Sequence, residues 1–112
     1  FVAYSLTNGS TRVQRLSEFT ASSTNANTAL TNSERVLIQQ VNDAENHNGG
    51  DLHFGPDGYL YMSWGDEGGS NDQLNNSQTI TRDFWSSITR IDVDLEPPDL
   101  TPSGSGPGDD AN

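Results

Sequence analysis

One histidine and one aspartate occupy glycine-rich segments at the two ends of a predicted hairpin. His47 lies in the polar segment 42–50, and Asp66 follows the β-prone run 59–65. An imidazole titrates near neutral pH, so it can take a proton from a hydroxyl group. A carboxylate that accepts the other imidazole N–H fixes the tautomer and raises the basicity of the ring. Taken alone, a loop histidine is more often a surface or turn-capping residue, and Asp66 more often a strand or turn cap.

A second group of side chains offers the hard oxygen ligands that calcium prefers. Segment 43–47 starts like a calcium-binding loop, but it has histidine at the third ligand position and no glutamate at the twelfth. Clusters of this kind more often consist of acidic loop residues that are simply exposed to water. Low-affinity calcium binding is therefore a secondary hypothesis. Its candidate ligands are Asp66, Glu67, Asn71 and Asp72.

Length and charge exclude several classes of function. The chain has 112 residues, enough for one small domain. Its 16 acidic and 5 basic residues give a formal net charge of -11, which makes it a poor ligand for nucleic acids and for anionic membranes. No apolar run is long enough to span a bilayer. The absence of cysteine excludes disulfides, thiolate catalysis and Cys-based zinc sites.

Two β-hairpins are the clearest structural prediction. The first occupies residues 1–20, where Asn8 and Gly9 both tolerate positive φ and are placed in the turn. An irregular alternation in its second half indicates a bulge. The second hairpin spans residues 51–65, with a Gly-Pro-Asp-Gly turn at 55–58. Its aromatic residues are expected to pack within the sheet.

Two more strands are expected from the pattern of apolar residues. Residues 34–41 form one strand, with Val36, Ile38 and Val41 facing inward. Residues 87–94 form the other by alternation. Its core candidates are Ile88, Thr89 or Arg90, Ile91 and Val93.

Long polar segments separate these strands. Residues 21–34 and 66–81 are loops by composition, and residues 80–85 are expected to hold a short helical turn. Residues 96–112 form a Pro/Gly/Asp-rich loop or tail. The fold class is therefore all-β, with five or six short strands. The apolar content is thin for an independent core.

Three motifs occur together in the middle of the chain. They are a His-x-Gly-Gly loop at 47–50, the turn at 55–58 and a Gly-Asp-x-Gly sequence at 65–68. In this combination the chain resembles the PQQ-dependent soluble sugar dehydrogenases, also called glucose/sorbosone dehydrogenase-like proteins, which are six-bladed β-propellers. The similarity continues through Arg-Ile-Asp-Val-Asp at 90–94 and covers roughly residues 4–95.

The resemblance implies an activity and roles for two residues. It implies oxidation of a sugar C1 hydroxyl with hydride transfer to PQQ, with His47 as the general base and Asp66 as the group that orients it. It also implies PQQ and calcium as cofactors. Several members have arginine directly after the Gly-Gly pair, whereas this chain has Asp51. A carboxylate there disfavours a nearby tricarboxylate such as PQQ.

The length of the chain limits what it can do by itself. Propellers need about four to eight blades of four strands, at roughly 40–50 residues each. Residues 1–95 therefore hold about two blades' worth of strands. In the family, the basic residues that hold the cofactor and its calcium ligands lie downstream of the matched region. We expect a segment of a larger sugar dehydrogenase-like protein, inactive as the isolated chain, and the start at Phe1 rather than Met favours this.

Two alternatives stay open. One is a non-catalytic extracellular unit, in a fibre or surface layer, that self-assembles through open strand edges. The other is a small calcium-binding module. The expected partners are a sugar substrate, the rest of a propeller or copies of the chain itself. The expected location is extracellular or periplasmic, where the sequons at Asn8 and Asn75 permit glycosylation.

Overall fold

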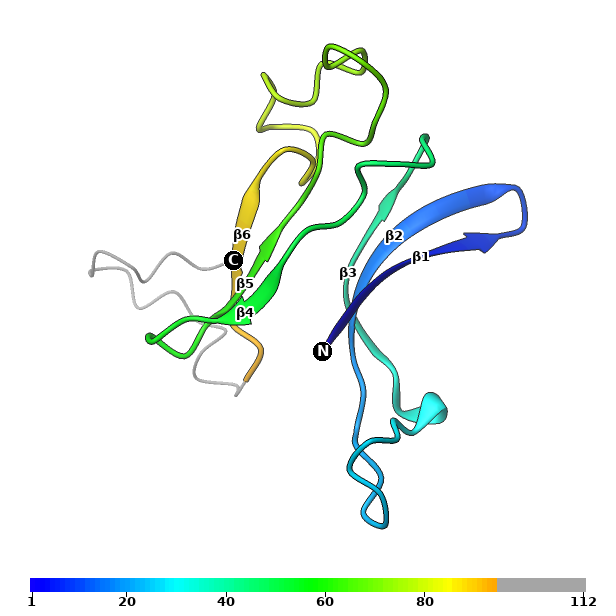
Figure 1. Cartoon of the computed structure of the whole chain (residues 1–112), viewed down its shortest axis with the longest axis vertical. Helices are drawn as coiled ribbons and strands as arrows, with labels where there is room; N and C mark the ends of the chain where they lie inside the picture. The colour runs from blue at the N-terminus through cyan, green and yellow to red at the C-terminus, as the bar shows by residue number, and fades with distance from the viewer. Residues whose placement is uncertain (95–112) are drawn as a thin grey trace.

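A computed structural model describes residues 1–94 as two antiparallel three-stranded sheets, consistent with part of a β-propeller (Figure 1). The all-β prediction is confirmed. The predicted tail at 96–112 lies outside the described residues. The first sheet contains β1 (Val2–Asn8), β2 (Thr11–Glu18) and β3 (Arg35–Val41), and the second contains β4 (Leu52–Phe54), β5 (Leu60–Ser63) and β6 (Ile88–Ile91). A 3-10 turn, η1 (Thr31–Ser33), is the one helical element among residues 1–94, so this part has no helix that could cross a membrane.

The turn of the first hairpin lies one residue later than the sequence predicts. Asn8 pairs with Thr11, so the two-residue loop is formed by Gly9 and Ser10. Gly9 has a φ of +65°. Glycine at the first loop position is typical of a type II′ turn. The Asn-Gly prediction is wrong here because the pairing register of the strands, as well as the dipeptide, decides which residues turn.

A β-bulge in β3 changes which of its side chains face the core. Ile38 and Val36 pair with consecutive residues of β2, so Leu37 between them is the extra residue. Leu37 and Ile38 both pack against the core as a result. Val36 and Val41 are exposed, and the prediction that they face inward is wrong. The inward position of Ile38 is confirmed.

The second hairpin forms as predicted, and β6 extends it. In the turn at 55–58, Gly58 has a φ of +86° and its N–H donates to the carbonyl of Gly55 at 3.1 Å. Ile91 pairs with the buried Leu60, whereas Ile88 pairs with the half-buried Ser63. Side chains alternate between faces along a strand, so Ile88 and Ile91 point to opposite sides. Ile88 is exposed, which corrects its assignment to the core.

The core lies between the two sheets and contains both tryptophans. The ring of Trp64 meets that of Trp85 edge-on, with centroids 6.1 Å apart, and stacks on Phe84 at 6.0 Å. The expected packing role of Trp64 is thus confirmed. Residues 80–85 form bends and a turn rather than the predicted helical turn, and this path brings Trp85 inward. The buried apolar residues of the cluster are Leu16, Leu60, Met62, Trp64, Trp85 and Val93.

Two long loops emerge at the same end of the molecule. The segment 42–51 joins β3 to β4, and the segment 64–87 joins β5 to β6 (Figure 1, upper part). The backbone N–H of Glu67, in the second loop, donates to the carbonyl of His47, in the first, at 3.2 Å. The fold therefore brings the two glycine-rich motifs side by side.

Candidate active site

His47 and Asp66 are in direct contact, as the sequence predicts. Nδ1 of His47 lies 2.8 Å from Oδ1 of Asp66. The imidazole is about half exposed and the carboxylate is about one quarter exposed. When Nδ1–H donates to Asp66, Nε2 is the ring nitrogen that can accept a proton. The pair therefore has the arrangement of a general base with an orienting carboxylate.

The backbone around His47 is tightly confined. His47 has a φ of +53°, in the left-handed region that non-glycine residues rarely adopt. A β-carbon placed on Gly65 would lie 1.9 Å from the carbonyl oxygen of His47. Only glycine fits at position 65, and its absent side chain allows the loop of His47 to approach the loop of Asp66.

Hydrogen bonds keep the Asp66 carboxyl ionised. Donation from the His47 ring lowers the pKa of Asp66, and the Gly68 N–H, 3.1 Å from the same oxygen, lowers that pKa further. Both donors favour the charged form. Asp66 is therefore an anion at neutral pH and can accept a hydrogen bond from the His47 ring.

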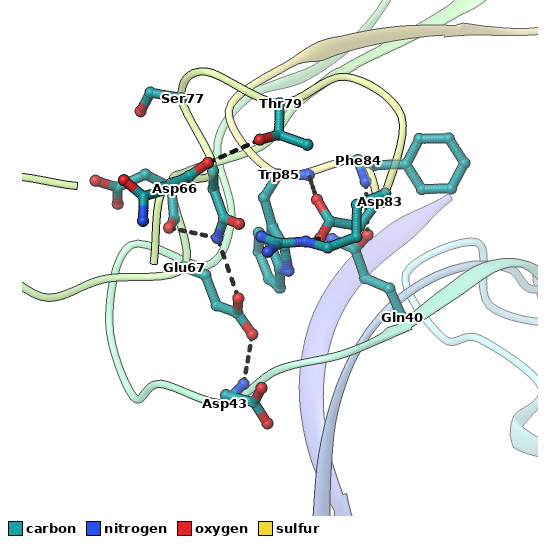
Figure 2. A network of polar contacts seen from close by, with 12 residues as sticks. Gln40, Asp43, Asp66, Glu67, Ser77, Thr79, Asp83, Phe84 and Trp85 are labelled. Carbon is teal, nitrogen blue, oxygen red and sulfur yellow. Dashed lines mark hydrogen bonds and ion pairs between the residues drawn. The ribbon is translucent and has the colours of Figure 1, made fainter. Parts of the chain in front are cut away.

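A buried polar network that the sequence did not reveal includes the backbone of Asp66 (Figure 2). The Glu67 side chain is buried and accepts a hydrogen bond from the backbone N–H of Asp43. The Asn76 side chain is also buried, and its Nδ2 lies 2.9 Å from the Asp66 carbonyl oxygen and 3.1 Å from Oε2 of Glu67. A single asparagine in a long polar loop has no sequence pattern that indicates burial, so only its tertiary contacts reveal its role.

The predicted calcium ligands do not gather around one point. Asp72 accepts hydrogen bonds from the backbone N–H groups of Asn76, at 2.8 Å, and Ser77, at 3.2 Å. Asn71 is exposed, and Glu67 faces Asp43. Among residues 1–94, no three His, Cys, Asp or Glu side chains are arranged to hold a metal ion. Calcium binding by these loops stays a prediction.

The second histidine is separate from the pair. His53 lies on β4 and its Nε2 is 3.0 Å from Oδ2 of Asp51, with both side chains about three quarters exposed. Asp51 thus occupies the position after the Gly-Gly pair with its carboxylate turned to a neighbouring imidazole.

A cavity of about 400 Å³ lies next to the buried network. Its charged lining consists mainly of the carboxylates of Asp43, Glu67 and Asp83. Arg82 also lines it, but the guanidinium forms an ion pair with Asp83 at 2.7 Å. The cavity is therefore acidic in character and favours neutral polar ligands over anions.

Comparison with known proteins gives one family and several relatives. The family model described as Glucose / Sorbosone dehydrogenase matches residues 1–111. Hedgehog-interacting protein from Mus musculus is 33% identical over 84 residues, which are 75% of this chain and 12% of that protein. HIPL1 protein from Arabidopsis thaliana is 36% identical over 88 residues, covering 73% of this chain and 12% of that protein. The chain thus spans a small part of the curated relatives that it matches.

Proposed function

We propose that this chain, which belongs to the glucose/sorbosone dehydrogenase family, supplies the general base of a PQQ-dependent sugar dehydrogenase-like protein. The observation that supports the proposal is the 2.8 Å contact between Nδ1 of His47 and Oδ1 of Asp66. Both residues lie in the motifs that resemble this family. The chain covers a small part of the length of its relatives. The reaction is therefore proposed for the native protein that contains this sequence.

The role of His47 is to remove a proton from the substrate. Oxidation of a sugar C1 hydroxyl to a lactone breaks the O–H and C1–H bonds and removes one proton and one hydride. Nε2 of His47 accepts the proton, while Asp66 holds Nδ1–H and stabilises the imidazolium that forms. The hydride needs an acceptor, and this is the chemistry that PQQ supplies in the family.

The residues that line this cavity do not fit PQQ by themselves. PQQ is a tricarboxylate, and its binding requires cationic donors. The cavity next to the buried network presents the carboxylates of Asp43 and Glu67, and its arginine is already paired. The cationic groups that hold the cofactor are therefore expected outside this cavity.

Reduction of an artificial electron acceptor by the native protein, with aldoses, PQQ and calcium, tests this proposal. We expect His47→Asn to lower kcat/KM by about 10²- to 10⁴-fold, because a positioned general base contributes this much. His53→Asn is the matched control, since His53 is exposed and lies outside the pair. Equal activity in the two variants would overturn the assignment of His47 as base.

A second candidate function is a non-catalytic one. A relative of this chain is named Hedgehog-interacting protein, and that name describes a binding function in that protein. β1 and β3 are the edges of the first described sheet, as β4 and β6 are of the second, so partners or further copies can add strands there. Regular self-association without acceptor reduction favours this alternative over catalysis.

The proposal includes an extracellular or periplasmic location. The two sequons are compatible with a secretory route, and Asn75 is exposed on the loop between β5 and β6. Fractionation of the native source, with a glycosidase-induced mass change as a second readout, tests this placement.

A further inference from the structure

We infer that Glu67 and Asn76 are positioning residues that hold His47 and Asp66 together. The hydrogen bonds that join Asp43, Asp66, Glu67 and Asn76 are here called the clasp. The catalytic meaning of the clasp rests on the proposed function, whereas its effect on the geometry of the pair does not.

The clasp joins the two loops that carry the pair. The Glu67 side chain accepts the backbone N–H of Asp43, which precedes His47 in the first loop. Figure 2 shows Glu67 between Asp43 and the Asp66 backbone. Asn76 Nδ2 then bridges the Asp66 carbonyl oxygen, at 2.9 Å, and Oε2 of Glu67, at 3.1 Å. One amide therefore fixes Asp66 and the side chain that anchors the opposite loop.

The two central side chains of the clasp are buried. Glu67 is 5% exposed and Asn76 is 1% exposed. A buried carboxylate is destabilising unless it is hydrogen-bonded, and a buried amide that loses a partner is also unfavourable, to a smaller degree. Removal of either side chain takes away one of the two hydrogen-bond partners of the other, so the effects of the two residues are coupled.

Backbone strain shows why the pair needs such support. His47 and Glu67 have φ angles of +53° and +69°, and the Glu67 N–H donates to the His47 carbonyl. Non-glycine residues persist in this region when the surrounding contacts hold them there. The clasp supplies these contacts at Glu67, while Gly65 provides the space that His47 requires.

Asn76→Ala in the native protein tests the inference. We expect kcat/KM to fall about tenfold or more, because small displacements of a catalytic group reduce the rate strongly. Gln78→Ala is the matched control, since Gln78 is exposed in the same loop. In an Asp66→Asn background the same change should add little, because the contact that the clasp maintains is already lost. Full additivity of the two losses would overturn the inference.

The tautomer of His47 provides a readout that does not depend on activity. Nitrogen-15 NMR of histidine-labelled protein, with His47→Asn for assignment, measures the proportion of the Nδ1–H form. We expect this form to dominate in the wild type and to give way to the mixture of an unrestrained imidazole in Asn76→Ala. An unchanged tautomer in a folded Asn76→Ala protein would overturn the inference.

A second variant tests the positioning role of the clasp if Asn76→Ala does not fold. Glu67→Gln keeps the side-chain volume but replaces one of the two accepting oxygens with an NH₂ group, so the side chain can no longer accept from both the Asp43 N–H and Asn76 Nδ2. We expect the same change in tautomer. An unchanged tautomer in Glu67→Gln would overturn the inference. Retained activity in His47→Asn, together with a tautomer that responds to the clasp, would reject the base proposal and support the positioning role.

Discussion

Gly65 contacts the backbone of His47 so closely that no side chain fits between them. A β-carbon on Gly65 would lie 1.9 Å from the His47 carbonyl oxygen and 2.5 Å from its carbonyl carbon. Both atoms belong to the backbone, so they cannot move aside as the end of a flexible side chain can. This contact determines how near the two loops of the candidate active site come to each other.

Gly65→Ala is therefore expected to separate the loops. We expect a loss of about 1–3 kcal/mol in the free energy of unfolding, as in other overpacked sites, together with loss of activity. Gly49→Ala is the control in the His47 loop, where the added carbon meets Gln14 at an ordinary 3.7 Å. Chemical denaturation of both variants measures the difference. Equal stability of the two proteins would contradict this prediction.

Trp85 is expected to contribute most to the stability of the long loop between β5 and β6. It is 2% exposed and packs edge-on against Trp64. We expect Trp85→Ala to lower the free energy of unfolding by about 3–5 kcal/mol, the usual effect of removing a buried aromatic ring. Phe84→Ala should have a smaller effect, because the Phe84 ring is 43% exposed. Urea denaturation would disprove the prediction if Phe84→Ala were the more destabilising change.

The hydrogen bonds of the Asp57 carboxylate predict that the stability of the folded protein depends on pH. Its carboxylate accepts hydrogen bonds from the Tyr61 hydroxyl at 2.7 Å and from Nε of Arg90 at 3.1 Å, and these bonds lower the pKa of Asp57. A lowered pKa in the folded state stabilises the protein above the ordinary carboxyl value of about 3.9. This contribution disappears as the pH falls through the lowered value.

The measurement is the melting temperature of wild type and Asp57→Asn between pH 7 and pH 3. We expect the wild type to melt higher at neutral pH and the difference to close below about pH 4. Asp94→Asn, at an exposed position, should show a much smaller difference throughout. A constant gap between wild type and Asp57→Asn across this range would argue against the assignment.

Chelation tests the calcium prediction for Asp66, Glu67, Asn71 and Asp72. An ion that binds only the folded state raises the free energy of unfolding, by about 2.7 kcal/mol at a hundredfold excess of free ion over Kd, and thereby raises the melting temperature. The prediction is that EGTA lowers the melting temperature and that calcium, but not magnesium, restores it. Asp72→Asn should abolish the response. An identical melting temperature with and without EGTA would exclude this site.

Local sequence signals predicted the strands better than the side-chain orientations. The Gly-Pro-Asp-Gly turn and its β-prone flanks identified β4 and β5, because turn chemistry and strand propensity act within a few residues. The exposed side of Val36 depended on the bulge at Leu37, which arises from pairing with β2. The outward position of Ile88 likewise followed from its pairing with Ser63.

The candidate site likewise contains residues that local motifs predicted and residues that only the tertiary structure revealed. The His-x-Gly-Gly and Gly-Asp-x-Gly motifs marked His47 and Asp66, and the structure joins these residues at 2.8 Å. Neither motif indicated that Asn76 would be buried with Glu67. Burial of a loop amide depends on contacts between segments far apart in the chain, and these contacts cannot be predicted from composition.

The sequence by itself determined an all-β chain, two hairpins and the histidine and aspartate able to do proton chemistry. These follow from local turn preferences, β-propensity and the chemistry of individual side chains. The tertiary structure alone decided the pairing registers, the inward path of Trp85 and the clasp. Those features come from long-range packing and from the need of buried polar groups for partners, which no short stretch of residues specifies.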